Sequence, residues 1–169
     1  MKTDIKKINF KFNIKNNLKA KSILKKYPKN YSSSAVIPLL HLAQDQLGGW
    51  LNKFAIEYIA KYLNLSLMRV YEVATFYHMF NLQKVGKYCI HVCTTTPCWL
   101  KGSDNILRQI EKNFKIKAGK TTNDNLVTLK ETECLGACIN APLIKINNDF
   151  YENLNSKSLE ELMNTIKNK

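Results

Sequence analysis

Residues 88–98 have the sequence Tyr-Cys-Ile-His-Val-Cys-Thr-Thr-Thr-Pro-Cys, in which a run of strand-forming residues ends at a cysteine. Cys93 and Cys98 form a C-x4-C pair, and Cys134 and Cys138 form a C-x3-C pair about forty residues further on. Four thiolates brought together make a complete ligand set for a metal centre. We therefore expect a fold that brings the two pairs together.

The segments around the two pairs alternate between strand and helix patterns. Tyr88 to Cys93 is rich in β-forming residues, and Gly102-Ser103 is expected to cap an amphipathic helix that ends near Phe114. The order from residue 88 is β-α-β-β-β-α, which predicts a reduced thioredoxin-like domain with helices packed on the sheet. The remaining expected elements are strands at 126–130, 143–146 and 150–151, a turn at 147–149, and a helix that opens with a capping box at Ser158-Leu-Glu-Glu161 and ends near Ile166.

The earlier half of the chain shows helical patterns. The chain is therefore predicted to be an α+β protein, with an N-terminal arm and helical bundle in residues 1–84 and the thioredoxin-like domain in residues 85–169. Three consecutive serines, 32–34, are expected to supply N-cap oxygens to the second helix of the bundle. The expected helices cover about 18–26, from the serines to Gln46, about 52–63, and from Ser66 to Phe76.

The N-terminal arm has two distinctive features. Ile8, Phe10, Phe12 and Ile14 alternate with other residues, which predicts an edge strand that pairs with a partner. The first thirty residues hold ten lysines and one acidic residue, in a chain of net charge +13. Such an arm binds nucleic acid or an acidic protein surface, or simply keeps a mobile segment soluble.

The chemistry of the cysteines follows from their positions. Each pair comes after the end of a strand, so both pairs are expected in loops that meet at one end of the sheet. Iron-sulfur clusters are held in this way, because loops can wrap the inorganic core and offer backbone N–H groups to its sulfurs. Gly136 and Ala137 keep the second loop small, and the threonines 94–96 supply hydroxyls and amides. A 2Fe-2S core needs two thiolates per iron, which the two pairs provide.

Other interpretations of the cysteines stay open. Structural zinc also takes four thiolates, although C-x3-C beside C-x4-C is not its usual spacing. A redox disulfide is expected as C-x-x-C, which the sequence lacks, and four buried cysteines with no shared role are a further alternative. Cys89 lies within the first strand and is predicted to be a core residue. His91 is not expected as a ligand, because it precedes Cys93 by two residues on that strand.

Composition limits the classes of function. The 169 residues can bury one good core or a small domain with a helical appendage, and no apolar run is long enough to span a bilayer. The first residues lack the apolar core of a signal peptide, and the absence of arginine before Arg69 argues against a transit peptide. We expect a reducing compartment, in which paired cysteines are more often metal-binding or catalytic than structural disulfides.

A second class of function is a redox-sensing DNA-binding regulator. Residues 59–70 have a passable helix-turn-helix pattern, and the chain is basic. Against this hypothesis, the would-be recognition helix is apolar and offers only Arg69 to a base.

The aromatic-rich stretch 71–80 has the spacing of a helix with one apolar face, so most of it is expected in the core. Trp99 is expected to shield the centre from water or to pack on a partner.

Six motifs in the same order resemble one family. The family is the 2Fe-2S subunit of the NADH dehydrogenase module of NADH:quinone oxidoreductase, or respiratory complex I, which has relatives in NAD-linked hydrogenases and formate dehydrogenases. The resemblance covers nearly the whole chain from about Ile8. Lys84 and His78 depart from it, and neither is a neighbour of the cysteines. The motifs are Tyr27-Pro28, Ser34-Ala-Val-Ile-Pro-Leu-Leu40, Gln46-Leu-Gly-Gly-Trp50, Val70-Tyr-Glu-Val-Ala-Thr-Phe-Tyr77, Val92-Cys-Thr-Thr-Thr-Pro-Cys-Trp-Leu100 and Glu133-Cys-Leu-Gly-Ala-Cys-Ile-Asn-Ala-Pro142.

The resemblance implies a place in an electron-transfer chain. It assigns Cys93, Cys98, Cys134 and Cys138 as ligands of one 2Fe-2S cluster, with no catalytic residue on this chain. The implied partners are a subunit that binds NADH and FMN, with which the cluster exchanges electrons, and other subunits of the peripheral arm. The implied location is the cytoplasmic side of a membrane, with no direct membrane insertion and no nucleic acid. Whether the parent enzyme is complex I or a hydrogenase or formate dehydrogenase relative stays open at this point.

Overall fold

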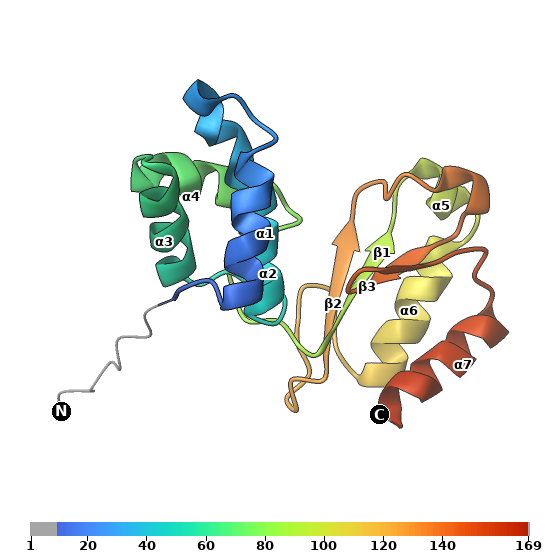
Figure 1. Cartoon of the computed structure of the whole chain (residues 1–169). Helices are drawn as coiled ribbons and strands as arrows, with labels where there is room; N and C mark the ends of the chain where they lie inside the picture. Colours follow the sequence, from blue (N-terminus) through green and yellow to red (C-terminus); the bar gives the residue numbers. More distant parts are fainter. Residues whose placement is uncertain (1–9, 169) are drawn as a thin grey trace, which may run out of the picture. The chain divides into compact units, whose positions relative to one another are not determined.

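The computed structural model describes residues 10–168 and confirms an α+β fold (Figure 1). The chain divides into two compact units between Lys84 and Val85. In the described residues, the first unit is helical and the second holds a four-stranded sheet with helices. No helix within residues 10–168 is long and apolar enough to cross a membrane. Ile8 and the lysines before residue 10, which belong to the predicted edge strand and basic arm, lie outside the described residues.

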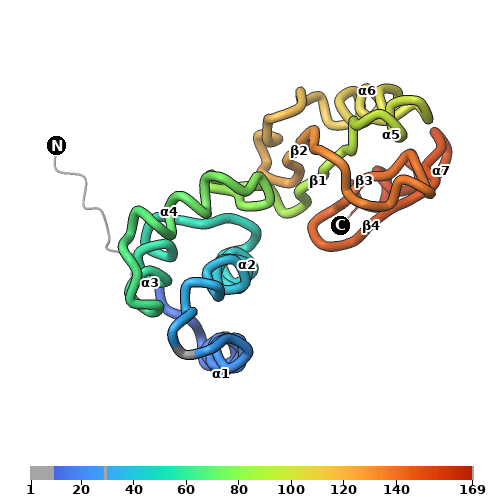
Figure 2. Tube along the Cα trace, turned by 90° about the horizontal axis from the view of Figure 1, so that it is seen from above, coloured from blue at the N-terminus to red at the C-terminus, as the bar shows by residue number. Residues whose placement is uncertain are grey.

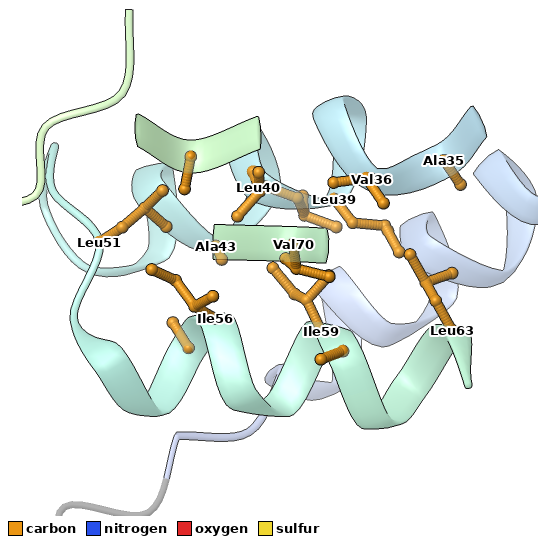
Figure 3. Packing of buried hydrophobic residues seen from close by; sticks show 14 of the residues in the cluster. Ala35, Val36, Leu39, Leu40, Ala43, Leu51, Ile56, Ile59, Leu63 and Val70 are labelled. Carbon is orange, nitrogen blue, oxygen red and sulfur yellow. The ribbon is translucent and has the colours of Figure 1, made fainter. Parts of the chain in front are cut away.

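The first unit packs its helices around one apolar core. Leu39 and Leu40 meet Ile56, Ile59 and Val70 from two other helices, and all five side chains are almost completely buried (Figure 3). In α2 (Val36–Gln46) the buried residues Val36, Leu39, Leu40 and Ala43 have three- and four-residue spacings, which place them on the inner face of the helix. The elements are α1 (Ile14–Leu24), the 3₁₀ segment η1 (Lys29–Ala35), α2 (Val36–Gln46), α3 (Lys53–Leu63) and α4 (Leu67–Phe76).

Side-chain caps determine where α3 and α4 begin. The side chain of Asn52 accepts a hydrogen bond of 2.8 Å from the backbone N–H of Ala55. The hydroxyl of Ser66 accepts one of 3.3 Å from the backbone N–H of Arg69. Each bond satisfies an amide that the first helical turn leaves without a partner. The predicted extents of these two helices are confirmed within one residue.

The predicted cap of α2 is wrong. Ala35 occupies the N-cap position and offers no side-chain hydrogen bond, while the three serines lie in η1. The hydroxyl of Ser32 instead donates to the carbonyl oxygen of Leu63, at 3.4 Å, near the end of α3. The Ser32 hydroxyl therefore makes a tertiary contact instead of the local helix cap that the sequence pattern predicts. Pro38 lies in the first turn of α2, as expected.

The edge-strand prediction is also wrong for residues 10–14. Phe10 and Phe12 are buried in the first unit, where their rings meet the ring of Tyr58 edge-on at centroid distances of 5.5 and 5.3 Å. Gln46 holds the same segment, because its side-chain amide donates to the carbonyl oxygen of Lys11 at 2.8 Å. The alternation of phenylalanines thus reflects packing on α3 rather than pairing with a partner.

Helix α1 begins four residues earlier than predicted. Asn13 is its N-cap, and the side chain of Asn13 accepts a hydrogen bond of 2.8 Å from the backbone N–H of Asn16. The carbonyl oxygen of the Gln46 side chain accepts from the backbone N–H of Asn13 at 3.1 Å. Ile14, expected in the edge strand, is instead an exposed residue of α1. The start of this helix is therefore fixed by one local cap and one long-range contact.

The second unit is a mixed sheet with strand order β2-β1-β3-β4 (Figures 1 and 2). Strands β1 and β2 are parallel, whereas β3 runs antiparallel to both β1 and β4. Alternate strand residues, among them Ile90, Leu129 and Ile144, form one apolar core with α6 and α7. The elements are β1 (Tyr88–Cys93), α5 (Thr96–Leu100), α6 (Ser103–Phe114), β2 (Val127–Thr132), the 3₁₀ turn η2 (Cys138–Asn140), β3 (Ile144–Ile146), β4 (Asp149–Tyr151) and α7 (Ser156–Lys167).

Several local predictions for this unit need correction. Helix α5 was not predicted, and the trace runs from β1 directly into it (Figure 2). Gly102, at φ 89°, precedes α6 without a side-chain cap, and the Ser103 hydroxyl is buried with no partner among the described residues. The capping box of α7 exists, but Asn155 is the N-cap and Ser158 is the third helical residue. Strand β2 continues to Thr132, two residues beyond its predicted end.

The packing of Gly86 beside β2 generates a prediction. A Cβ atom added to Gly86 would lie 2.9 Å from backbone atoms of Leu126 and Val127, and the backbone N–H of Gly86 donates to the Thr128 hydroxyl at 2.7 Å. We expect Gly86→Ala to reduce the free energy of unfolding by about 1 to 3 kcal/mol, because the strand backbone must move. Urea unfolding monitored by circular dichroism measures this.

Gly119→Ala is the matched control. Gly119 has φ 81° and no atom within 4 Å of an added Cβ, so this change carries only the backbone strain of about 1 kcal/mol. A Gly86→Ala protein as stable as the native chain would show that the close approach is not a constraint.

Candidate metal centre

The ends of β1 and β2 bring the two cysteine-bearing loops to one edge of the sheet. Cys93 is the last residue of β1 and is the register partner of Thr132, the last residue of β2. Just beyond, the backbone N–H of Thr94 donates to the carbonyl oxygen of Thr132 at 3.2 Å. On the other side, the N–H of Cys93 donates to the carbonyl oxygen of Leu143 at 3.4 Å. The loop that carries Cys134 is therefore anchored to the end of β1 at both its ends.

The first cysteine pair is buried. Cys93 ends β1 and Cys98 lies in α5, so the second of these thiols is on a short helix rather than in the predicted loop. Both side chains have no exposed surface. They pack with Leu143 and, in part, with Leu135, Ala137 and Ala141, all of which come from the second loop or its end.

The second cysteine pair is exposed. Cys134 and Cys138 lie on the surface, and their sulfur atoms are 3.2 Å apart. Gly136 has φ 84° between them, and its backbone N–H donates to the sulfur of Cys134 at 3.4 Å. A residue with a Cβ disfavours this conformation, so the glycine permits the loop to turn its amide toward the sulfur.

The two thiols of the buried pair have opposite pKa shifts. Burial raises the pKa of Cys93, but the hydroxyl and backbone amide of Thr95, with the Cys98 thiol and the amide of Leu135, hold the pKa below its usual value. Burial and the neighbouring Cys93 thiol raise the pKa of Cys98 to about 11. Of the two thiols, Cys93 therefore loses its proton more readily than Cys98. Because Leu135 belongs to the second loop, the two loops are in contact.

The two thiols of the exposed pair also have opposite pKa shifts. The backbone amide of Gly136 is the main group that lowers the pKa of Cys134, and the Cys138 thiol adds to it. The Cys134 thiol raises the pKa of Cys138. In each pair one thiol therefore loses its proton more readily than the other, and thiolates are the form in which cysteines bind metals.

These residues fit a two-iron cluster. The thiols come as two contacting pairs, which matches the need of a 2Fe-2S core for two cysteine sulfurs at each iron. The hydroxyl oxygen of Thr95 lies 3.2 Å from the sulfur of Cys93, and the amide of Gly136 donates to the sulfur of Cys134. Within residues 10–168, no three cysteine, histidine or acidic side chains are placed around one point as ligands of a single metal ion.

Cys89 is a separate, buried thiol in β1. Its sulfur lies 3.3 Å from Nε2 of His91, and its backbone N–H donates to the side-chain oxygen of Asn147 at 2.9 Å. Burial raises the pKa of Cys89, against the opposing effect of Lys130 and Lys145. Cys93 is four positions further along the strand, which is about 13 Å of extended chain. The predicted role of Cys89 as a core residue agrees with this position.

Exposed apolar side chains follow one cysteine of each pair in the chain. Ile139 directly follows Cys138 and is 93% exposed, and Trp99 and Leu100 follow Cys98 and are also exposed. The indole N–H of Trp99 donates to a carboxylate oxygen of Asp104 at 3.1 Å, which fixes the ring at the surface. Trp99 was among the residues singled out from the sequence, whereas Ile139 was not.

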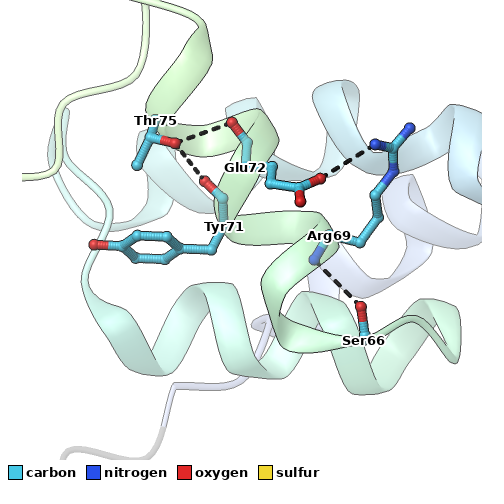
Figure 4. A network of polar contacts seen from close by, with 5 residues as sticks. All are labelled: Ser66, Arg69, Tyr71, Glu72 and Thr75. Carbon is cyan, nitrogen blue, oxygen red and sulfur yellow. Dashed lines mark hydrogen bonds and ion pairs between the residues drawn. The ribbon is translucent and has the colours of Figure 1, made fainter.

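Helix α4 also has an exposed apolar side, which contradicts the prediction that residues 71–80 are mostly core. Only Val70 and Ala74 of this helix are buried. Around them, the polar contacts are local: the Thr75 hydroxyl donates to backbone carbonyls, and Arg69 pairs with Glu72 at 3.2 Å (Figure 4). The exposed side chains, which we name the α4 apolar face, are Leu67, Met68, Tyr71 and Phe76.

The spacing in α4 could have shown this. At 3.6 residues per turn, Leu67, Val70 and Ala74 lie on one side of the helix. Met68 and Phe76 lie on the opposite side together with Glu72, and Tyr71 lies between the two sides. The number of apolar residues in a helix does not show which of them are buried and which are exposed. Exposed apolar side chains of such a helix are available to contact a partner.

Comparisons with known proteins agree with this geometry. The family model described as thioredoxin-like [2Fe-2S] ferredoxin matches residues 20–167. Over 163 residues the chain is 56% identical to the NADH-quinone oxidoreductase E subunit of Rickettsia prowazekii (strain Madrid E), covering 96% of this chain and 92% of that protein. Over 159 residues it is 50% identical to "NADH dehydrogenase [ubiquinone] flavoprotein 2, mitochondrial" of Dictyostelium discoideum, covering 94% of this chain and 64% of that one.

A solved structure shares the fold. The chain is similar to part of an NAD⁺-reducing [NiFe]-hydrogenase crystallised in the H₂-reduced state, with a TM-score of 0.71 and 22% identity. The similarity covers 80% of this chain and 22% of the hydrogenase chain. At this identity it shows the fold alone. The family match confirms the thioredoxin-like prediction for the sheet-containing unit.

The different burial of the cysteines predicts their reactivity. In the reduced, metal-free chain, we expect iodoacetamide to modify Cys134 roughly tenfold faster than Cys89, because Cys134 is exposed and Cys89 is buried with a raised pKa. Mass spectrometry of peptides after timed quenching measures the order of labelling. Cys89 labelled as early as Cys134 would contradict the burial of that strand.

Proposed function

The chain belongs to the thioredoxin-like [2Fe-2S] ferredoxin family and, within it, to the 2Fe-2S subunits of NADH-quinone oxidoreductase, and on this premise we propose how it works in respiratory complex I. It is an electron-transfer subunit of the NADH dehydrogenase module. The observation that carries the proposal is the meeting of two thiol pairs at the joined ends of β1 and β2, in a chain related to these subunits over almost its whole length.

The ligand set in this proposal is Cys93, Cys98, Cys134 and Cys138. When bound, a 2Fe-2S cluster takes up and gives back one electron at a time. The buried pair would hold the cluster rigidly, because its side chains pack with Leu143 in an apolar core. The exposed pair leaves the other side of the centre close to the surface, where a partner's cofactor can approach.

The proposed partner is the subunit that binds NADH and FMN. The sequence has no G-x-G-x-x-G after a strand, so nucleotide and flavin sites are expected on that partner rather than on this chain. Trp99 and Leu100 directly follow Cys98, Ile139 directly follows Cys138, and all three side chains are exposed and apolar. Aromatic and aliphatic anchors of this kind exclude water from an interface, which supports contact at this edge.

The first unit supports a second contact surface. The α4 apolar face leaves large side chains in water, and Phe76 is 79% exposed. Large apolar side chains exposed near one another are found at protein interaction sites, which supports a contact here. We assign it to contacts with the flavin-bearing subunit or another subunit of the peripheral arm, on the cytoplasmic side of the membrane.

We also propose that residues 1–84 and 85–169 are separate domains.

Two other functions remain as alternatives. The equivalent subunit of an NAD-linked hydrogenase or formate dehydrogenase would have the same centre, and the hydrogenase similarity is a similarity of fold. A DNA-binding regulator is disfavoured by α4, since four large apolar side chains of this helix are exposed and Arg69 is paired with Glu72. Binding of duplex DNA that weakens steeply with salt would restore the second alternative.

Purification without oxygen tests the centre. We expect about two irons and two sulfides per chain and a rhombic EPR signal after reduction with dithionite. Cys134→Ala should lose most of the iron, because one iron loses a thiolate. Cys89→Ala, the matched control at a buried cysteine outside the pairs, should keep it. One zinc per chain and no EPR signal would exclude the proposed function.

The α4 apolar face gives a prediction about assembly. Phe76→Ser should weaken binding to the flavin-bearing subunit by about 2 kcal/mol, or roughly thirtyfold, because it removes a large apolar anchor. Pull-down and calorimetric titration of the two purified subunits measure this. Ile14→Ser is the control, because Ile14 is an exposed apolar residue on α1. Equal affinities of both variants and the native chain would show that α4 is not at this interface.

A further inference from the structure

Thr95 has an unusual hydrogen bond for its position. It is the N-cap residue of α5, and its carbonyl oxygen accepts the first helical bond from the N–H of Trp99 at 2.9 Å. A threonine at an N-cap ordinarily accepts a hydrogen bond from an amide of the first turn. The hydroxyl of Thr95 makes no such bond, and Oγ1 lies 3.2 Å from the sulfur of Cys93.

The other polar N-caps of the described residues make this contrast sharp. Asn13, Asn52, Ser66 and Asn155 each accept a hydrogen bond from an amide at the start of their own helix. Thr95 is the exception within residues 10–168. Its hydroxyl is directed to the sulfur of Cys93 at the expense of the cap, on a helix of five residues.

The direction of this bond follows from the chemistry of the centre. A sulfur that binds iron is a thiolate and carries no proton, so the hydroxyl must be the donor. Donors to cluster sulfurs are one of the levers that set reduction potentials, because they stabilise the added negative charge of the reduced state. Cys93 is fully buried, so water does not compete for this hydrogen bond.

We propose that Thr95 is a positioning residue whose hydroxyl donates to the Cys93 sulfur and makes the centre easier to reduce. This inference rests on the proposed 2Fe-2S function. The step is a one-electron reduction, in which the electron comes from the flavin-bearing partner or from dithionite in the test. No bond to hydrogen breaks, and the hydroxyl proton stays on Thr95.

The test uses the full chain purified without oxygen and four variants. Thr95→Val and Thr95→Ala remove the hydroxyl, Thr95→Ser keeps it, and Thr94→Val removes a neighbouring hydroxyl from the same loop. A redox titration followed by EPR gives the midpoint potential of each. At the potential that half-reduces the native chain, we expect the reduced-to-oxidised ratio to fall about tenfold in the valine and alanine variants, a shift of about 59 mV for one electron.

The serine variant and Thr94→Val should stay within about twofold of the native ratio, because both retain a hydroxyl at residue 95 that can donate to the sulfur. If the valine and alanine variants lose the cluster while the serine variant retains it, the hydroxyl positions the ligand, and the potential of the serine variant decides: a native potential supports the inference and a shifted one overturns it. Native potentials in the valine and alanine variants, an equal shift in Thr94→Val, or a serine variant that matches valine would overturn it.

The failure of this inference differs from failure of the proposed function. A native chain that shows the rhombic signal, with variants that do not shift, overturns the role of Thr95 alone. A native chain without a 2Fe-2S signal overturns both.

Discussion

The parallel pairing of β1 with β2 is the constraint on which the centre depends. Cys93 and Thr132 are register partners at the ends of their strands, so the loops that follow both strands start at one edge of the sheet. A shift of one residue would turn Ile90 and Val92 out of the core. The burial of these side chains therefore fixes the register, and the register fixes where the thiols meet. Strand β3 strengthens this arrangement, because it pairs with β1 directly after the second loop.

The two alternating sets of side chains along β1 lie on opposite faces of the sheet and have different roles. One face packs its apolar residues against α6 and α7, while Cys89, His91 and Cys93 alternate with that set along β1. Within the centre, the first pair is buried beside an apolar cluster and the second lies on the surface. A buried pair keeps its geometry, and an exposed pair shortens the path to a partner. The hydroxyl of Thr95 belongs to the buried side, where water does not weaken its contact.

Helix α4 of the first unit has residues in the core and large apolar residues exposed to solvent. Val70 and Ala74 of α4 join the core, while the residues of the α4 apolar face are exposed. In a free subunit this surface is unfavourable in water, and its presence is explained by assembly into a larger complex. The pairing of Arg69 with Glu72 leaves little positive charge on this helix for nucleic acid (Figure 4). Both observations connect the basic, cysteine-containing chain to protein partners.

The sequence by itself determined the α+β class, the helices from Asn52 and Ser66, the strand order along the chain and the cysteine pairs after two strands. These features follow from short-range patterns, which act within a few residues. Tertiary structure decided the burial of Phe10 and Phe12, the loss of the Ser32 cap to Leu63, the exposure of the α4 apolar face and the position of the Thr95 hydroxyl. Each depends on which distant surface packs against the residue, and a local pattern carries no information about that surface.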